Sequence, residues 1–148
     1  MEEFIDFIIN LADEEIGDYL DGDVKHYFLN GGCYEFAKVL KNYARESRFV
    51  INKESNHCGI LHLGNIYDAT GKVDKKEKFH IATKEDKEYM DFRFGILEKQ
   101  QVKGKRISDY LISILDQCYI SDILEKVNDG KRINSKNMQD VEVDEDER

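Results

Sequence analysis

Proline is absent from all 148 residues of the chain, and only three of its residues are cysteine. Without proline there is no rigid turn residue and no cis-proline bond to isomerise during folding, so glycine, asparagine and aspartate have to form the turns. The cysteines at positions 33, 58 and 118 cannot complete a disulfide framework, and none lies in a C-x-x-C metal motif. This usage predicts reduced thiols, no metal site and a cytoplasmic protein.

Long apolar runs and a basic surface are also missing. No run approaches the roughly 18 apolar residues of a membrane span, and the acidic start MEEFIDFIINLADEE lacks the positive region of a signal peptide. The net charge is −9, and acidic residues interrupt the densest basic stretch, residues 72–78. Because nucleic-acid binding needs clustered lysine and arginine to neutralise phosphates, we expect neither a membrane nor a nucleic acid as a partner.

The composition suits one folded domain. Hydrophobic residues make up 41% and aromatic residues 11% of the chain, enough for a core at this length. The negative charge is concentrated at the end, where residues 138–148 hold six acidic residues and one basic residue. A polar segment without an apolar face has nothing to bury. We therefore predict a single domain over residues 1–128 and a disordered tail over residues 129–148.

Apolar residues at spacings of three and four predict helices at both ends of the domain. The first covers residues 4–20, and an irregular stretch should follow over residues 24–30. A second helix should begin at Cys33, with its thiol towards the core and Glu35 facing outward. A further helical pattern covers residues 107–119 and extends to residue 127.

Between these helices the pattern changes to that of strands. The predicted strands are residues 48–51, 57–63, 66–69 and, at an edge, 79–81. Gly64-Asn65 is a signal for a two-residue hairpin turn. In the resulting register Leu61 pairs with Asp68, so His57 and Asp68 share one face of the sheet but lie about 13 Å apart. Direct contact requires a wider loop or a bulge that moves Asp68 towards His57.

Residues 84–98 are ambiguous between a helix and a helix followed by a strand. Thr83 and Asp86 at their start have the spacing of a helix capping box. Together the elements predict an α+β fold. In it, the helix that begins at Cys33 packs on a small antiparallel sheet, with additional helices at the N- and C-terminal ends.

The residues around Cys33 favour a reactive thiol. A thiol attacks efficiently only when it is ionised, and a free cysteine with a pKa of about 8.5 is mostly protonated at neutral pH. The partial positive charge at a helix N-terminus and a neighbouring imidazolium both favour the thiolate. Gly31 and Gly32 let the backbone turn sharply into the helix and leave the sulfur approachable. Backbone N–H groups of the first turn could hold an oxyanion, with Asn30 or Tyr27 as a side-chain donor.

A histidine and an aspartate follow the cysteine on adjacent predicted strands. GGCYEFAKVL resembles the nucleophile-helix motif of papain-like cysteine hydrolases, in their NlpC-like and transglutaminase-like branches, and HCGILHLGNIYDATG resembles the histidine hairpin of those proteins. The resemblance covers residues 27–71. It implies a papain-like fold with Cys33 as the nucleophile, His57 as the general base and Asp68 as the residue that orients the imidazole.

Each of these residues also has a structural interpretation. Cys33 fits an ordinary buried cysteine on an apolar stripe, and Asp68 fits a turn cap before Gly71. A metal site of His57, His62 and Asp68 is disfavoured because the two histidines point to opposite faces of a strand. Cys58 and Cys118 are expected in the core. His62 is expected at solvent or against a neighbouring strand. His80 is expected to be structural, and His26 could line the cleft.

The resemblance implies a cysteine-dependent hydrolase or acyltransferase that acts on a peptide-type amide bond through a thioester at Cys33. Water as the acceptor makes it a peptidase, amidase or deamidase, and an amine makes it a transglutaminase-like transferase. No cofactor is required, and the expected substrate is a protein or a small amide. The alternative is a non-catalytic binding or inhibitor protein, from a phage or mobile element, that keeps the papain-like scaffold.

Overall fold

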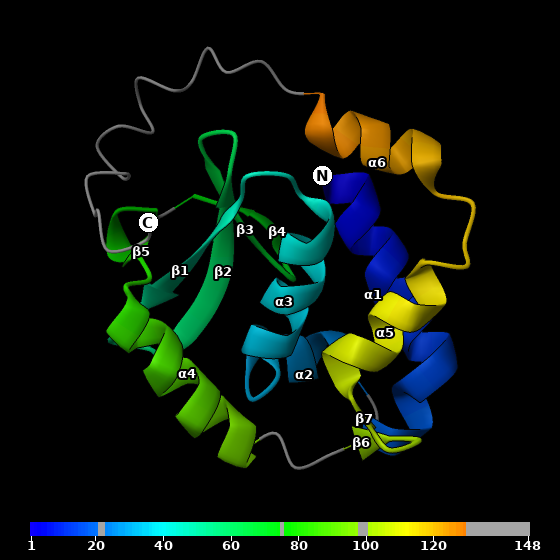
Figure 1. Ribbon diagram of the computed structural model, residues 1–148, viewed down its shortest axis with the longest axis horizontal. Coiled ribbons are helices and arrows are strands. Elements are labelled where there is room, and N and C mark those ends of the chain that lie inside the picture. The colour runs from blue at the N-terminus through cyan, green and yellow to red at the C-terminus, as the bar shows by residue number, and fades with distance from the viewer. Residues whose placement is uncertain (21–22, 75, 98–100, 130–148) are drawn as a thin grey trace.

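The computed structural model describes residues 1–20, 23–74, 76–97 and 101–129. These residues form a mixed fold of helices and a small antiparallel sheet, so the predicted α+β class is confirmed (Figure 1). The predicted tail, apart from its first residue, lies outside the described residues. No helix in the described part of the chain combines the length and the apolar character of a membrane span.

The first helix follows its predicted periodicity. α1 (Glu2–Ile16) is succeeded by a 3-10 turn, Gly17–Leu20. The side chains that α1 buries lie on one stripe of the helix, as an amphipathic helix requires: Phe4, Ile5, Ile8, Ala12 and Ile16.

The stretch predicted to be irregular contains a short helix, α2 (Val24–Leu29). Its start is fixed by Asp23, whose carboxylate accepts hydrogen bonds from the N–H groups of Lys25 at 3.0 Å and His26 at 3.2 Å. The prediction was wrong here because six residues are too few to show a helical period.

α3 (Cys33–Tyr43) lies at the centre of the molecule, between the sheet and α5 (Ile107–Leu115) (Figure 1). Glu35 does not face outward as predicted. Its carboxylate is fully buried, accepts a hydrogen bond from the N–H of Ser108 at 2.9 Å and pairs with Arg106 at 2.6 Å. These partners satisfy a buried charge. They come from the start of α5, far along the chain, so the local pattern around Glu35 could not reveal them.

The sheet has five antiparallel strands in the order β4-β3-β2-β1-β5. The three central strands and the edge strand β5 were predicted within a few residues, whereas β4 was not predicted, because it begins at a glycine, which is typical of the end of a strand. The strands are β1 (Arg48–Asn52), β2 (His57–His62), β3 (Asn65–Asp68), β4 (Gly71–Val73) and β5 (His80–Ile81), with a 3-10 turn at Lys76–Lys78 before the last.

The register between β2 and β3 differs from the predicted one by two residues. His62 pairs with Asn65, so Leu63 and Gly64 form the turn rather than Gly64 and Asn65. Leu63 and Gly64 have φ angles of 51° and 85°, the left-handed conformation that a tight hairpin turn needs. A leucine is seldom found there because its side chain disfavours positive φ. The shift moves Asp68 two residues further along β2 than predicted, towards the start of that strand.

The segment that was ambiguous in the sequence is a helix, α4 (Lys84–Leu97). Its predicted capping box is confirmed: the N–H of Asp86 donates to the Thr83 hydroxyl at 3.1 Å, and the N–H of Thr83 donates to the Asp86 carboxylate at 3.0 Å. A small hairpin of β6 (Gln101–Val102) and β7 (Lys105–Arg106) then leads into α5.

α5 ends at Leu115, four residues before the end of the predicted stripe. Tyr119 is consequently fully exposed. Cys118 is half-buried instead of lying in the core, and its thiol donates to the carbonyl of Ile114 at 3.4 Å. The last turn of the predicted pattern was therefore wrong, because apolar spacing continues past the point where the helix stops.

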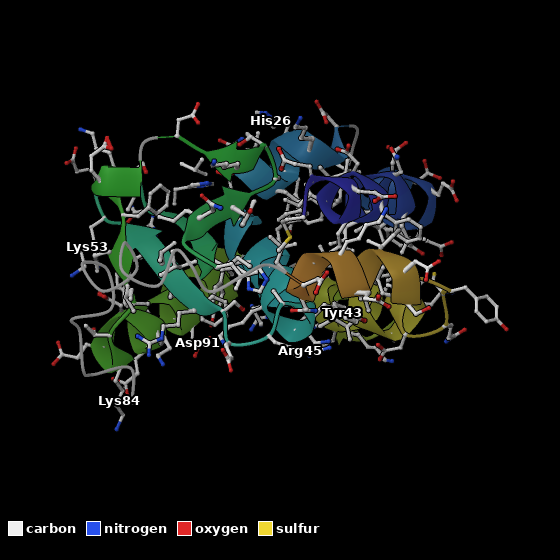
Figure 2. The ribbon with its side chains drawn as sticks, turned by 90° about the horizontal axis from the view of Figure 1, so that it is seen from above. His26, Tyr43, Arg45, Lys53, Lys84 and Asp91 are labelled. Atoms are coloured by element: carbon white, nitrogen blue, oxygen red, sulfur yellow. The ribbon has the colours of Figure 1, made fainter. Side chains whose placement is uncertain are left out.

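α6 (Ser121–Asn128) packs against α1 and closes the C-terminal side of the described fold. Its last residue is bonded to the segment that follows α3. The Asn128 amide donates to the carbonyl of Tyr43 at 3.0 Å and accepts from the N–H of Arg45 at 2.7 Å. Figure 2 shows Tyr43 and Arg45 beside this helix. These bonds fix the end of α6 to the end of the central helix.

Candidate active site

Cys33 is the first residue of α3, directly after the cap residue Gly32. It is 2% exposed, and its sulfur lies 3.9 Å from the carbonyl oxygen of Asn56, at the end of the β1–β2 turn. Glycine is required at position 32 because a Cβ atom there would come within 2.2 Å of the Tyr27 ring. The thiol therefore lies at the positive end of a helix of 11 residues, in a closed environment.

Asp68 contacts His57 across the β2–β3 hairpin, with His57 Nε2 and Asp68 Oδ2 2.7 Å apart. The observed register, continued by one pair, brings Asp68 level with Gly59 instead of Leu61, two residues closer to His57 and on the same face. Gly59 allows the strands to approach here, since a Cβ atom would come within 2.6 Å of the Tyr67 carbonyl oxygen. The register shift thus supplies the contact that the predicted hairpin could not make.

The Asp68 carboxylate is held from its other side by Thr70. Asp68 Oδ1 accepts hydrogen bonds from the backbone N–H of Thr70 at 2.8 Å and from its hydroxyl. Burial alone would raise the pKa of the Asp68 carboxyl, but the hydrogen bonds from His57 and Thr70 outweigh it and lower the pKa. Asp68 is therefore an oriented anion at neutral pH.

His57 lies between a carboxylate and a thiol. Burial alone would lower its pKa, but the hydrogen bond to Asp68 and the interaction with the Cys33 side chain raise the pKa of His57 to about 9. Because Asp68 engages Nε2, Nδ1 is the ring nitrogen left for the sulfur. The Phe79 ring packs edge-on against the imidazole, with centroids 6.1 Å apart. This arrangement places an oriented imidazole beside the thiol, which is the contact that activates a nucleophilic cysteine.

The other two thiols have different surroundings. Cys58 is 1% exposed and lies in the core as predicted, where burial raises the pKa of its thiol. Cys118 is half-buried and bonded to a helix carbonyl. Only Cys33 has an imidazole beside it among the described residues.

The two predicted oxyanion donors make contacts within the α2–α3 turn. The Asn30 amide donates to the carbonyl of His26 at 2.7 Å, and the Tyr27 ring lies over Gly32. His26 itself is exposed at the edge of the molecule, against Asn30 (Figure 2), and does not line the neighbouring pocket. The backbone N–H groups in the first turn of α3 are closer in chain position to the sulfur and would be the better candidates for oxyanion donors.

A pocket of about 540 Å³ opens beside the histidine. Its lining includes His57 and Gly31, which lies two residues before Cys33 in the chain, while Arg93 comes from α4. Its lining residues are Leu29, Asn30, Gly31, Ser55, Asn56, His57 and Arg93. Ser55, Asn56 and Arg93 were not predicted as site residues from the sequence. The only sequence signal for this part of the pocket was an asparagine directly before His57. Asn56 has a φ of 54°, a turn conformation that asparagine tolerates better than most residues.

The remaining histidines have structural contacts. His62 was expected at solvent or against a strand, but it is 3% exposed and its Nε2 lies 2.8 Å from the carbonyl oxygen of Val127 in α6. Burial lowers the pKa of His62, so it is neutral at physiological pH. His80 Nε2 lies 3.0 Å from Asp86 in the cap of α4. In the described part of the chain, no three histidine, cysteine, aspartate or glutamate side chains are arranged to hold a metal ion.

Comparison with protein families gives a match over most of the described fold. A family model described as Phage YunG-like protein matches residues 13–112 of the chain. The matched segment contains α2, α3, the whole five-stranded sheet and α4, and therefore includes Cys33, His57 and Asp68. No curated protein and no solved structure matches the chain.

Proposed function

The chain belongs to the phage YunG-like family, and from the geometry of its site we propose that it is a cysteine-dependent hydrolase or acyltransferase with a papain-like arrangement. The supporting observation is the position of His57 between the Asp68 carboxylate and the Cys33 thiol, at the N-terminus of the central helix. A thiol next to an oriented imidazole is an activated nucleophile. The substrate is a protein or a small molecule with an amide bond.

In the first half-reaction the Cys33 thiolate attacks the carbonyl carbon of the amide, and the carbonyl oxygen becomes an oxyanion. N–H groups in the first turn of α3 stabilise that charge. When the intermediate collapses, the C–N bond breaks and His57 donates its proton to the leaving amine, which leaves a thioester on the sulfur. Asp68 keeps the imidazole oriented and stabilises its charged form.

In the second half-reaction water or an amine attacks the thioester carbonyl. His57 accepts the proton of the attacking group, and the sulfur leaves as the thiolate, so the thiolate–imidazolium pair is restored. With water the product is a carboxylic acid, and with an amine it is a new amide. Both outcomes use the same three residues.

One observation favours a different class of function. Cys33 is 2% exposed, as a structural cysteine would be. In that case the chain is a non-catalytic binding or inhibitor protein of phage origin that retains the scaffold. The two functions differ in the chemistry that they require of the thiol.

Alkylation of Cys33 with iodoacetamide at pH values from 5.5 to 9 separates the two functions. A Cys118→Ser background removes the one partly exposed thiol among the three cysteines, Cys33→Ser is the blank, and mass spectrometry locates the modification. The proposal predicts a rate at pH 6 within about threefold of that at pH 9, because the thiolate is already formed. A rate that rises about tenfold per pH unit up to roughly pH 8.5 would favour the binding protein.

A further inference from the structure

The pocket beside His57 holds one permanent charge, the guanidinium of Arg93. None of the described residues that line it is acidic. When His57 is positively charged and Cys33 is a thiolate, the two charges cancel, so the pair adds no net charge to the pocket. The described lining of the pocket therefore carries a net charge of about +1, with no acidic residue among those described to neutralise it.

The Arg93 side chain is only partly exposed, and its Nε atom is buried without a hydrogen-bond partner among the described residues. A guanidinium keeps its charge at any pH that a folded protein experiences, so it cannot avoid the cost by deprotonation. A buried donor without an acceptor is unfavourable. Because Nε has no accessible surface, a ligand oxygen in the pocket would pair with the part of the guanidinium that stays accessible, and Arg93 is among the residues that line the pocket.

The position of Arg93 relative to the sulfur is fixed by two contacts of α4. The hydroxyl of Tyr34, the residue after Cys33, donates to Asp91 at 2.7 Å. The hydroxyl of Tyr89 donates to Asn56 Oδ1 at 3.4 Å. One contact ties α4 to the start of α3 and the other ties it to the turn before His57, so both halves of the site hold the helix that carries Arg93.

We propose that Arg93 binds a carboxylate of the substrate, so that the site acts on amides with an acidic group next to the reacting bond. The inference rests on the proposed function. A guanidinium matches the planar, singly charged carboxylate with two parallel hydrogen bonds. A phosphate would bring nearly two charges to a pocket that offers one. The carboxylate belongs either to an acidic side chain or to the C-terminus of a chain, and both present the same group.

Two reagents that differ in one charge test the proposal. Iodoacetate and iodoacetamide alkylate the same sulfur, but only iodoacetate carries a carboxylate next to the reacting carbon. The rate ratio of iodoacetate to iodoacetamide is measured at Cys33 in the Cys118→Ser background and compared with the ratio for N-acetylcysteine. We expect the ratio at Cys33 to be about tenfold higher, the effect of one charge-assisted hydrogen bond.

Three variants assign that preference to Arg93. Arg93→Gln should reduce the ratio to that of N-acetylcysteine, and Arg93→Lys should retain part of it because the charge remains. Lys84→Gln is the matched control: it removes the same charge from the same helix, but Lys84 lies at the outer end of α4, away from Asp91 (Figure 2). The control should keep the wild-type ratio. Equal loss in Lys84→Gln and Arg93→Gln would show a diffuse field instead of a site and would overturn the proposal.

The outcomes separate this inference from the proposed function. If Cys33 is alkylated rapidly at low pH but shows the ratio of N-acetylcysteine, the carboxylate site is refuted and the nucleophile stands.

If neither reagent modifies Cys33, the proposed function fails, and the Arg93 Nε–H resonance in ¹⁵N NMR decides whether the pocket binds a carboxylate. N-acetylglycine presents a terminal carboxylate and N-acetylglutamate α-amide a side-chain carboxylate, with N-acetylglutamine amide as the neutral control. A shift with either acid but not with the control supports the proposal, and no shift with either overturns it.

Discussion

Two histidine–aspartate pairs in the structure have nearly the same distance between their side chains, and the histidine of each pair lies in a strand of the sheet. His57 and Asp68 are 2.7 Å apart, and His80 and Asp86 are 3.0 Å apart. Each aspartate is buried, and each accepts a hydrogen bond from the backbone N–H of a nearby threonine. The pairs differ in what lies next to the histidine.

The first pair adjoins a thiol, and the second adjoins solvent. The His57 side chain is 17% exposed and interacts with Cys33, whereas the His80 side chain is 43% exposed. Asp86 also caps α4 and pairs with Lys53 at 3.2 Å. A histidine–aspartate contact is therefore no sign of catalysis by itself. The sulfur and the helix N-terminus distinguish the first pair, and the second pair serves as its control.

The largest expected difference between the two pairs is their effect on the alkylation rate of the Cys33 thiol. His57→Gln should slow alkylation of Cys33 at pH 7 about thirtyfold, because only about 3% of a thiol with a pKa of about 8.5 is ionised at that pH. His80→Gln should leave the rate unchanged. The measurement is iodoacetamide labelling in the Cys118→Ser background, with circular dichroism as the check on folding. Equal rates in the two variants would mean that His57 does not activate the sulfur.

Removal of the carboxylate charge should have a smaller effect. Asp68→Asn keeps the shape but favours the wrong imidazole tautomer and removes the anion that supports the charged ring, so alkylation of Cys33 at pH 7 should slow about tenfold. Asp86→Asn should not change it. An unchanged rate in a well-folded Asp68→Asn variant would leave at best a dyad of Cys33 and His57. Lost stability with an unchanged rate would assign Asp68 a purely structural hydrogen bond.

The pH dependence of stability should separate the pairs by about 1 kcal/mol. In a Cys33→Ser background the proton on His57 is no longer offset by a thiolate. Burial lowers the pKa of His57, and we expect the contact with Asp68 to outweigh it and keep the folded-state pKa above the unfolded value. The resulting stabilisation is fully present below about pH 6.5 and is lost as the pH rises. Urea unfolding between pH 6.5 and 8 should show this decline, and Asp68→Asn, but not Asp86→Asn, should remove it.

The smallest effect concerns the second pair alone. Asp86→Asn keeps an acceptor for the Thr83 N–H but removes the negative charge from the first turn of α4 and from Lys53. The free energy of unfolding should fall by about 0.5–1 kcal/mol. Urea denaturation measures this loss. Slower alkylation of Cys33 in the same variant would show that the second pair also influences the thiol, and the contrast between the pairs would no longer hold.

The parts of the site that depend on short-range pattern could be predicted. The start of a helix at Cys33 follows from Gly31-Gly32 and the apolar stripe after it. The shared face of His57 and Asp68 follows from alternation along two strands, and it survives a register shift of two residues because the side-chain period is also two.

The parts that depend on distant partners could not be predicted. The turn at Leu63 requires a positive φ that its residue type disfavours, so only packing of the whole sheet selects it. The burial of Glu35 depends on Arg106 and Ser108 from the start of α5. Arg93 enters the pocket because Tyr34 bonds Asp91 in a helix whose apolar pattern was ambiguous.

The protonation of His57 tests the central claim most directly. Titration of its ring nitrogens by ¹⁵N NMR should give a pKa of about 9 in the wild-type protein, since Asp68 and Cys33 together favour the charged ring. Cys33→Ser and Asp68→Asn should each lower that pKa, and Asp86→Asn should not. A wild-type His57 that titrates at or below about 6.5, with no change in Cys33→Ser, would contradict the account, because the imidazole would then have no coupling to the thiol.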